Sequence, residues 1–180
     1  MEDRGRGRRA ADTVLHPTLS DAFEGLEYSV HVPAASVRRE LKTVFPGTDV
    51  GQILVVPTVQ QARCSLLSWG EEQAEEKDRL LERFVRWCEA VKKAVLKRET
   101  AWIDAVDPAS GVALWGGAAG VYNEVDGFAR TLGYDVQLVG SCPILEHPAW
   151  RFRSYPATLF CAARRNTLLH ALAEVNGATS

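Results

Sequence analysis

Hydrophobic and polar positions follow two periods along the first half of the chain. Over residues 26–32, apolar residues alternate with more polar ones, which predicts a strand with one apolar face. Over 37–45 the apolar residues recur at three- and four-residue steps after Ser36, so we expect a helix capped by Ser36 and ended by Pro46 and Gly47. Residues 53–59 are rich in β-branched side chains and predict a buried strand. Pro57 should confine part of that strand to an edge or a bulge.

The longest periodic segment runs from about residue 71 to 98. Its charged residues occupy the face opposite an apolar stripe, and they are acidic in the first turns and basic in the last, which complements the helix dipole. The segment therefore predicts a long amphipathic helix that packs on the core. The stripe consists of Leu80, Leu81, Phe84, Val85, Cys88, Val91 and Val95.

Two short apolar runs, 102–106 and 112–115, flank a turn of Asp, Pro and Gly residues at 107–111, which predicts a β-hairpin. A glycine-rich stretch follows at 116–120. It lacks the residue patterns of phosphate-binding loops, so a flexible loop is favoured over a nucleotide cradle. Residues 126–132 then predict a short helix closed by Gly133.

The last third of the chain predicts two strands and a helix. Residues 134–139 form a strand-like run, and a loop containing Pro and His follows it as far as Trp150. Residues 158–162 predict a further strand, and Asn166 should cap a final helix with an apolar stripe. Because strands and helices mix without strict alternation, the predicted fold is an α+β sandwich with a mostly antiparallel sheet.

The first 25 residues differ from the rest. Arginines and glycines over 4–9 are followed by a polar stretch without periodicity, which predicts a disordered basic arm at 1–25 before a globular domain at 26–180. Two alternatives are weaker. A mitochondrial transit peptide is disfavoured by Glu2, Asp3 and Asp12, because such peptides contain few acidic residues. Contact with nucleic acid is disfavoured because no aromatic residues lie among the arginines.

Composition narrows the class of protein. The chain has 180 residues, 46% hydrophobic and 24% charged, with a net charge of -2, which fits one globular domain and gives no general attraction to nucleic acid or membrane. No apolar run approaches the roughly 20 residues of a membrane span, and no secretory signal is present. We therefore expect an intracellular protein that binds neither nucleic acid nor membrane.

Cysteines and histidines show no metal-binding spacing. The four cysteines are Cys64, Cys88, Cys142 and Cys161, far apart and without a C-x-x-C pair. This spacing favours free thiols over a zinc site or a redox pair, and we expect no structural metal.

The segment 139–143 has two interpretations. Gly140 can adopt conformations closed to other residues, and Pro143 favours an extended Cys142 whose thiol faces away from the local chain. The segment is either a plain turn that contains a cysteine or a loop that presents a thiol to a partner. Residue types alone leave both open.

A family resemblance extends over roughly residues 27–172. The run 102–116, with its D-P-x-S-G turn, resembles the hairpin of the methylmalonic aciduria and homocystinuria type D (cblD) family. Further matches lie upstream at 55–60 and 68–72, and downstream at 123–134 and 140–150. The last of these is the pattern G-x-C-x-x-x-x-H-x-x-W. So many pieces in the same order carry a specific likeness.

The resemblance implies an adaptor rather than an enzyme. Its fold would be a modified nitroreductase-like sandwich without flavin. The adaptor would dock on the cblC-type cobalamin-processing protein and direct cobalamin, as cargo and not as a tightly bound cofactor, toward methionine synthase or methylmalonyl-CoA mutase. Because the family's long leader is mostly absent from this sequence, the cytoplasm is expected, with the mitochondrion as the second compartment.

The resemblance also implies a site. A family cysteine in a Gly-Cys-Cys segment contacts cobalt, and here that position holds Ser141, followed by Cys142. The expected cobalt contact is therefore Cys142 or Ser141. The expected docking loop comprises Gly140, Pro143, His147 and Trp150.

A cobalt contact by Cys142 depends on the charges near its thiol and on the direction of its side chain. Arg151 and Arg153 are the nearest cations in sequence that would favour a thiolate, and Glu146 would oppose them. In an extended segment Ser141 and Cys142 would point to opposite sides, so Cys142 would need a turn at Gly140 to take over the contact. The sequence also departs from the family in its short helix, where a tyrosine is replaced by Ala129.

Two enzyme classes compete with the adaptor. A cysteine-dependent enzyme would use Cys142 as nucleophile and His147 as base, although no oxyanion donor or third orienting residue is visible. A flavin nitroreductase is favoured only by analogy of fold. Selective alkylation of Cys142 would support the first, and uptake of flavin by the purified protein the second.

Overall fold

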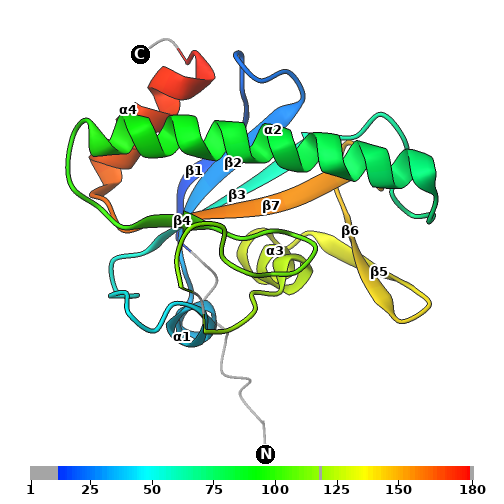
Figure 1. Cartoon of the computed structure of the whole chain (residues 1–180), viewed down its shortest axis with the longest axis horizontal. Coiled ribbons are helices and arrows are strands. Elements are labelled where there is room, and N and C mark those ends of the chain that lie inside the picture. The colour runs from blue at the N-terminus through cyan, green and yellow to red at the C-terminus, as the bar shows by residue number, and fades with distance from the viewer. Residues whose placement is uncertain (1–11, 118, 179–180) are drawn as a thin grey trace, which may run out of the picture.

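The computed structural model describes residues 12–117 and 119–178, so the arginine-rich run 4–9 lies outside the described residues. A five-stranded sheet lies between two layers of helices (Figure 1). Every neighbouring pair of its strands is antiparallel. The strands, in their order across the sheet, are β1 (Asp12–Leu19), β2 (Leu26–Val32), β3 (Leu54–Gln61), β7 (Ser154–Cys161) and β4 (Ile103–Ala105). A mixed α+β fold with a mostly antiparallel sheet is thereby confirmed.

Strand β3 occupies the centre of the sheet. It pairs with β7 along its whole length, from Leu54 opposite Cys161 to Gln61 opposite Ser154. The prediction of an edge position for Pro57 is wrong, because β2 lies on the other side of β3. The register with β2 passes from Thr58 directly to Val55, so Pro57, which has no N–H to donate, falls in this interruption.

The two longest helices, α2 (Glu71–Leu96) and α4 (Arg165–Asn176), cover one face of the sheet. The predicted apolar stripe of α2 is confirmed, although Leu81 and Val85 are only partly buried and Trp87 joins the core instead. The Trp87 indole N–H donates to Oδ1 of Asn176 at 2.9 Å, which joins the two helices.

The other face carries α1 (Ala35–Val44) and α3 (Glu124–Leu132). Helix α3 begins at Glu124, two residues before the predicted start, because the Asn123 side chain accepts the Asp126 N–H as an N-cap. Its predicted end is confirmed, since Gly133 follows the last residue with a left-handed φ of 70°. The predicted caps of the other helices are wrong. Ser36 and Asn166 lie within the helices, because α1 begins at Ala35 and α4 at Arg165, two residues before the predicted starts. The cap positions are Ala34 and Arg164, which make no side-chain cap hydrogen bond to the described residues.

Residues 12–19 form a strand, so the predicted disordered arm is wrong for this part. Strand β1 pairs with β2 from Asp12 opposite Val32 to Leu19 opposite Glu27, with two irregularities in register. Its residues are mostly exposed and show no alternation. The strand is therefore stabilised by its backbone ladder rather than by an apolar face, which explains why the sequence pattern missed it.

The hairpin predicted at 102–115 is confirmed in its first strand and its turn, but the predicted second strand at 112–115 is wrong, because these residues form one isolated bridge and no strand. After β4 a single bridge joins Val106 to Ala113, and the Asp107 N–H donates to the Val112 carbonyl at 2.9 Å. Gly111 has a φ of 69°, as the turn requires. None of the helices in the described part of the chain combines the length and the apolar character that a membrane span needs.

A second, two-stranded sheet stands apart from the first. Strands β5 (Asp135–Val139) and β6 (Cys142–Glu146) pair with each other, and their base packs on α3 while the turn points away from the body (Figure 1). The prediction of a loop from Gly140 to Trp150 is wrong for β6. Its sequence carries a proline and little alternation, so the partner strand determines its conformation.

Candidate functional site

The tip of the β5–β6 hairpin is a two-residue turn formed by Gly140 and Ser141. Val139 and Cys142 pair directly across it. Gly140 has a positive φ of 63°. Ser141 does not have a positive φ, since Arg151 is the one non-glycine residue in the described ranges that does. Glycine with positive φ at the first central position, followed by an ordinary second residue, is typical of a type II′ turn, whose twist suits a hairpin. The Gly-Ser pair therefore fixes this turn.

Large apolar side chains are exposed along β5. Val136 is 37%, Leu138 73% and Val139 40% exposed. By the register of the hairpin, Leu138 shares one face with Pro143, and Cys142 shares the other with Val139. Both faces of the tip therefore offer apolar surface to a partner.

Ser141 and Cys142 are both exposed at the tip. Ser141 lies in the turn and Cys142 begins β6, so the turn at Gly140 that would let Cys142 take over the contact is present. The other thiols are less accessible. Burial raises the pKa of Cys161 to about 11 and that of Cys88 well above its ordinary value, and Cys64 is only partly exposed. All four cysteines lie within the described ranges, and Cys142 is the one whose side chain is exposed.

The two arginines that were expected to act on Cys142 are engaged elsewhere. Arg151 forms an ion pair with Glu146 at the base of β6. Arg153 donates to the carbonyls of Ala62 at 3.1 Å and Arg63 at 2.8 Å. Both side chains stabilise the base of the hairpin rather than its tip.

His147 is buried at this base, and both ring nitrogens have partners. Nδ1 accepts the backbone N–H groups of Ala149 at 3.2 Å and Trp150 at 3.1 Å, so the ring proton lies on Nε2. Nε2 is 3.1 Å from Oε1 of Glu27, and the Tyr134 hydroxyl donates to the same oxygen at 3.1 Å. The histidine therefore joins the segment after β6 to strand β2.

Aromatic rings enclose this histidine. Trp150 stacks on His147 with ring centroids 4.4 Å apart, and Tyr134 meets it edge to face at 5.4 Å. Burial and the neighbouring Glu27 raise the pKa of Tyr134 well above its ordinary value, so its hydroxyl stays a donor. Leu145 and Phe128 pack in the same cluster. The base is thus rigid although the tip is exposed.

The structure does not bring Cys142 and His147 together. Cys142 begins β6 and His147 follows its last residue, so the two are five residues apart, which corresponds to roughly 16 Å along a strand. The histidine is also buried and has no free nitrogen. The expected docking loop is therefore divided, since Gly140 and Pro143 lie at the tip whereas His147 and Trp150 form the base.

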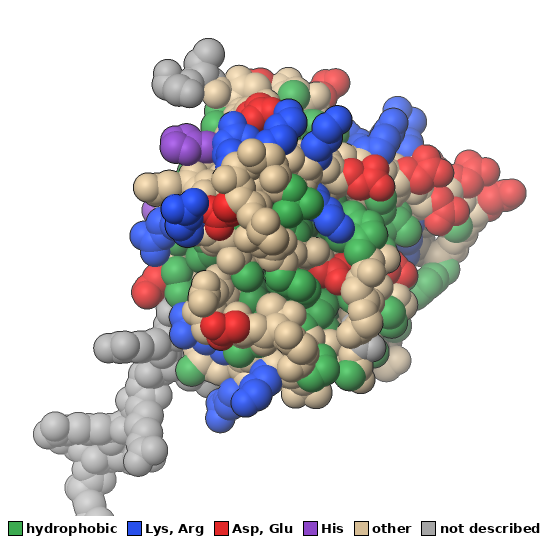
Figure 2. All heavy atoms as spheres, turned by 60° about the vertical axis from the view of Figure 1, so that its left-hand side comes forward, with side chains coloured by type: hydrophobic (Ala, Val, Ile, Leu, Met, Phe, Trp, Pro, Cys, Tyr) green, Lys and Arg blue, Asp and Glu red, His purple; other side chains and the backbone are tan. Residues whose placement is uncertain are grey.

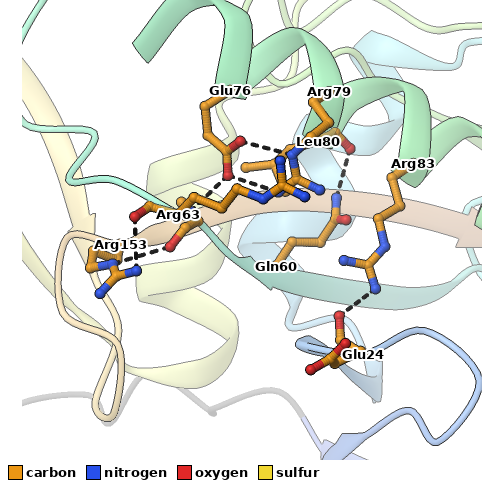
Figure 3. A network of polar contacts seen from close by, with 9 residues as sticks. Glu24, Gln60, Arg63, Glu76, Arg79, Leu80, Arg83 and Arg153 are labelled. Atoms are coloured by element: carbon orange, nitrogen blue, oxygen red, sulfur yellow. Dashed lines mark hydrogen bonds and ion pairs between the residues drawn. The ribbon is translucent and has the colours of Figure 1, made fainter. Parts of the chain in front are cut away.

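A polar network extends the base to α2 (Figure 3). Besides the two bonds from Arg153, Oε1 of Glu76 accepts the Arg63 N–H at 2.7 Å, and Arg79 binds both oxygens of the same carboxylate. The hydrogen bond from Arg79 is the main cause that lowers the pKa of Glu76. The segment after β3 is therefore held between the hairpin base and α2.

Sequence reasoning missed Glu27 and Tyr134 as parts of the site. Tyr134 is 107 positions from Glu27 and His147 is 120, so no local pattern could pair them. Among the described residues, no group of three or more His, Cys, Asp and Glu side chains could hold a metal ion. The candidate site is therefore an exposed hairpin tip on a rigid base.

Comparison with known proteins places this chain in a family. Residues 9–173 match the family model described as methylmalonic aciduria and homocystinuria type D protein. The chain belongs to this family. The resemblance predicted from the sequence motifs is thus confirmed.

Curated relatives carry one name, cobalamin trafficking protein CblD. The protein from Homo sapiens is 26% identical over 153 residues, which are 84% of this chain and 51% of that protein. The proteins from Rattus norvegicus and Mus musculus are 26% and 27% identical over 153 and 139 residues, which are 84% and 77% of this chain and 51% and 47% of those proteins. The chain spans about half the length of the curated relatives it matches.

Proposed function

We propose that the chain is a non-enzymatic adaptor in cobalamin (vitamin B12) trafficking. The observation that carries this proposal is the family match over residues 9–173, with relatives that are named cobalamin trafficking proteins. The geometry of the hairpin supports a docking role, because its exposed groups include three large apolar side chains on β5 and one thiol at the tip. The adaptor would handle cobalamin as cargo.

The proposed partner is the cblC-type cobalamin-processing protein, and the proposed docking element is the β5–β6 hairpin. Leu138 is the most exposed of the apolar residues on β5. Both ends of the hairpin are held at the base, because Tyr134 before β5 and His147 after β6 both bond to Glu27, so little conformational freedom is lost when a partner covers the tip. A rigid apolar projection of this kind suits a pocket on another protein.

Cys142 is the proposed contact to the cobalt of cobalamin bound on that partner. A thiolate is a soft ligand for a transition metal, whereas the hydroxyl of Ser141 is a poor one. Exposure of Cys142 at the tip supports this role. The cysteine-dependent enzyme is set aside because His147 is buried and bonded through both nitrogens.

The remaining parts of the proposal follow from the family resemblance. The cargo would pass toward methionine synthase or methylmalonyl-CoA mutase, in the cytoplasm with the mitochondrion as the second compartment. The α+β sandwich would be a modified nitroreductase fold that works without flavin.

The test combines the purified chain with cobalamin loaded on its processing partner, and records the cobalamin absorption spectrum together with co-elution. Wild type should co-elute and shift the cobalt bands, Cys142→Ser should co-elute without the shift, and Cys64→Ser should behave as wild type. A complex with the same spectrum in wild type and Cys142→Ser would contradict the cobalt contact. Absence of any complex would contradict the adaptor itself.

A further inference from the structure

Charge is unevenly distributed along α2. Its first two turns carry exposed acidic side chains, and its last two turns carry basic ones, although the whole chain has a net charge of only -2. The acidic residues are Glu71, Glu72, Glu75 and Asp78, and the basic ones are Lys92, Lys93 and Lys97, followed by Arg98. The two ends of the helix therefore attract partners of opposite charge.

The basic residues line two neighbouring hollows, which together we call the basic end. One, of about 520 Å³, lies beside Trp115 and the last turns of α2, and the other, of about 580 Å³, lies at the start of α4. Figure 2 shows Lys and Arg side chains gathered over this part of the surface. The basic residues that line the hollows are Lys92, Lys93, Lys97, Arg98, Arg164 and Arg165, and His170 lines the second.

Some of these cations are already paired. Lys97 and Arg98 bind Glu174, and Arg164 binds Glu99 at 2.7 Å. Glu99 also accepts the backbone N–H of Arg164 at 2.9 Å, so this carboxylate fills the start of α4 and leaves no open anion site there. Its pKa is lowered to about 2, first by the Thr167 hydroxyl.

Other cations of the basic end have no such partner. Lys93 and Arg165 form no ion pair with any residue between 12 and 178 that the structure describes, and both are exposed. The carboxylates Glu89, Glu99 and Glu174 are spaced among the six Lys and Arg side chains. Because the carboxylates separate the cations, the surface lacks the continuous row of positive charge that binds a nucleic acid backbone. Separated cations can instead pair with individual acidic side chains of a protein.

Apolar surface lies within the same end. The Lys92 ammonium is 4.3 Å from the centre of the Trp115 ring, and Leu96 is 46% exposed beside them. An indole next to an aliphatic side chain offers a contact for apolar residues of a bound segment. The basic end therefore combines charge with apolar surface, which a site for a small inorganic anion does not require.

We propose that the basic end binds an acidic protein segment that contains apolar residues. In Figure 1, α4 and the C-terminal end of α2 lie at the opposite side of the molecule from the β5–β6 hairpin. A protein held here leaves the hairpin free, so the chain can contact two partners at once. That bridging role rests on the proposed function, whereas the binding of an acidic segment does not.

The test uses the whole chain and a fluorescein-labelled peptide of glutamates with interspersed leucine and phenylalanine, followed by anisotropy. Lys93→Glu/Arg165→Glu reverses two cations that have no ion-pair partner among the described residues. Arg39→Glu/Lys42→Glu makes the same change of charge on exposed positions of α1, across the sheet. We expect the first variant to weaken binding at least tenfold, the second to change it less than twofold, and added salt to weaken binding to the wild type.

Three results would overturn the proposal. One is the absence of binding to the wild type at low salt, and another is equal weakening by both double variants. The third is displacement of the peptide by inorganic phosphate or single-stranded DNA at lower concentration than by unlabelled peptide, which would reassign the surface to phosphate groups. The measurement contains neither cobalamin nor the processing protein, so its failure leaves the proposed function untouched.

Discussion

Nε2 of His147 lies 3.1 Å from Oε1 of Glu27, although the residues are 120 positions apart. This bond joins the segment that follows β6 to strand β2 of the main sheet. The carboxylate also accepts the Tyr134 hydroxyl, from the segment that precedes β5. One glutamate therefore holds both ends of the hairpin, and the exposed tip projects from a fixed base.

Glu27→Ala should loosen this base. The change leaves the buried Nε2–H of His147 without a partner, which costs about 1–3 kcal/mol. We expect a lower free energy of unfolding in urea and faster amide exchange in β5 and β6. Glu24→Ala is the matched control, because Glu24 is exposed and the change keeps the backbone carbonyl that accepts the Arg83 hydrogen bond. Equal exchange in β5 and β6 for both variants would contradict the anchoring role.

The elements predicted from the sequence are those that local residue patterns determine, and the elements that were missed depend on pairing with distant residues. The amphipathic α2, the strand β2 and the turn at Gly133 follow from local periodicity and residue type, and all were predicted. Strands β1 and β6 were missed because their conformation depends on backbone bonds to a neighbouring strand. Their own residues carry no alternating pattern.

The candidate site divides in the same way. The family pattern identified Cys142 and the surrounding tip before the structure was known, and the tip is exposed as a docking element requires. It could not show that His147 is a buried anchor, since its partner Glu27 is distant in sequence. A histidine five residues from a cysteine predicts a dyad only when both residues lie in a flexible loop.

Glu124 should make stability fall as pH rises. Its carboxyl is buried at the start of α3, where Oε1 accepts the Thr158 hydroxyl and Oε2 has no hydrogen-bond partner among the described residues. Burial raises its pKa from 4.5 to about 8. The folded state therefore binds the proton more tightly than the unfolded state, so stability is lost between pH 4.5 and about 8, by an amount on the order of 3–5 kcal/mol.

Urea unfolding at several pH values measures this effect. Glu124→Gln cannot titrate and should remove the decline with pH, whereas Glu75→Gln at an exposed position of α2 should keep it. The same slope in wild type and Glu124→Gln would contradict a neutral buried carboxyl.

His31 should have the opposite dependence, at lower pH. It is buried in β2, with Nε2 2.9 Å from the Ser29 hydroxyl and Nδ1 3.3 Å from that of Thr13 in β1. Burial, with a smaller effect of His16, lowers its pKa from 6.5 to about 4. The unfolded state then binds the proton more tightly, so stability falls by about 3 kcal/mol as pH drops from 6.5 to about 4.

The difference between wild type and His31→Gln isolates this contribution from other titrating groups. The variant should lose the decline below pH 6.5, and the amide protection factors of β1, corrected for intrinsic exchange rates, should no longer fall in acid. His170→Gln, at an exposed position of α4, should retain both. A wild-type decline that persists unchanged in His31→Gln would show that another group is responsible.

The central claim is that the β5–β6 hairpin docks the chain on the cobalamin-processing protein, and one affinity comparison tests it. Leu138→Asp places a charge at the most exposed apolar position of the hairpin. The control, Val112→Asp, places the same charge at an exposed apolar residue outside the hairpin, in the turn after β4. We predict that Leu138→Asp raises the Kd for the cobalamin-loaded partner at least tenfold, about 1.4 kcal/mol, while Val112→Asp changes it less than twofold. Wild-type affinity of Leu138→Asp would contradict the claim.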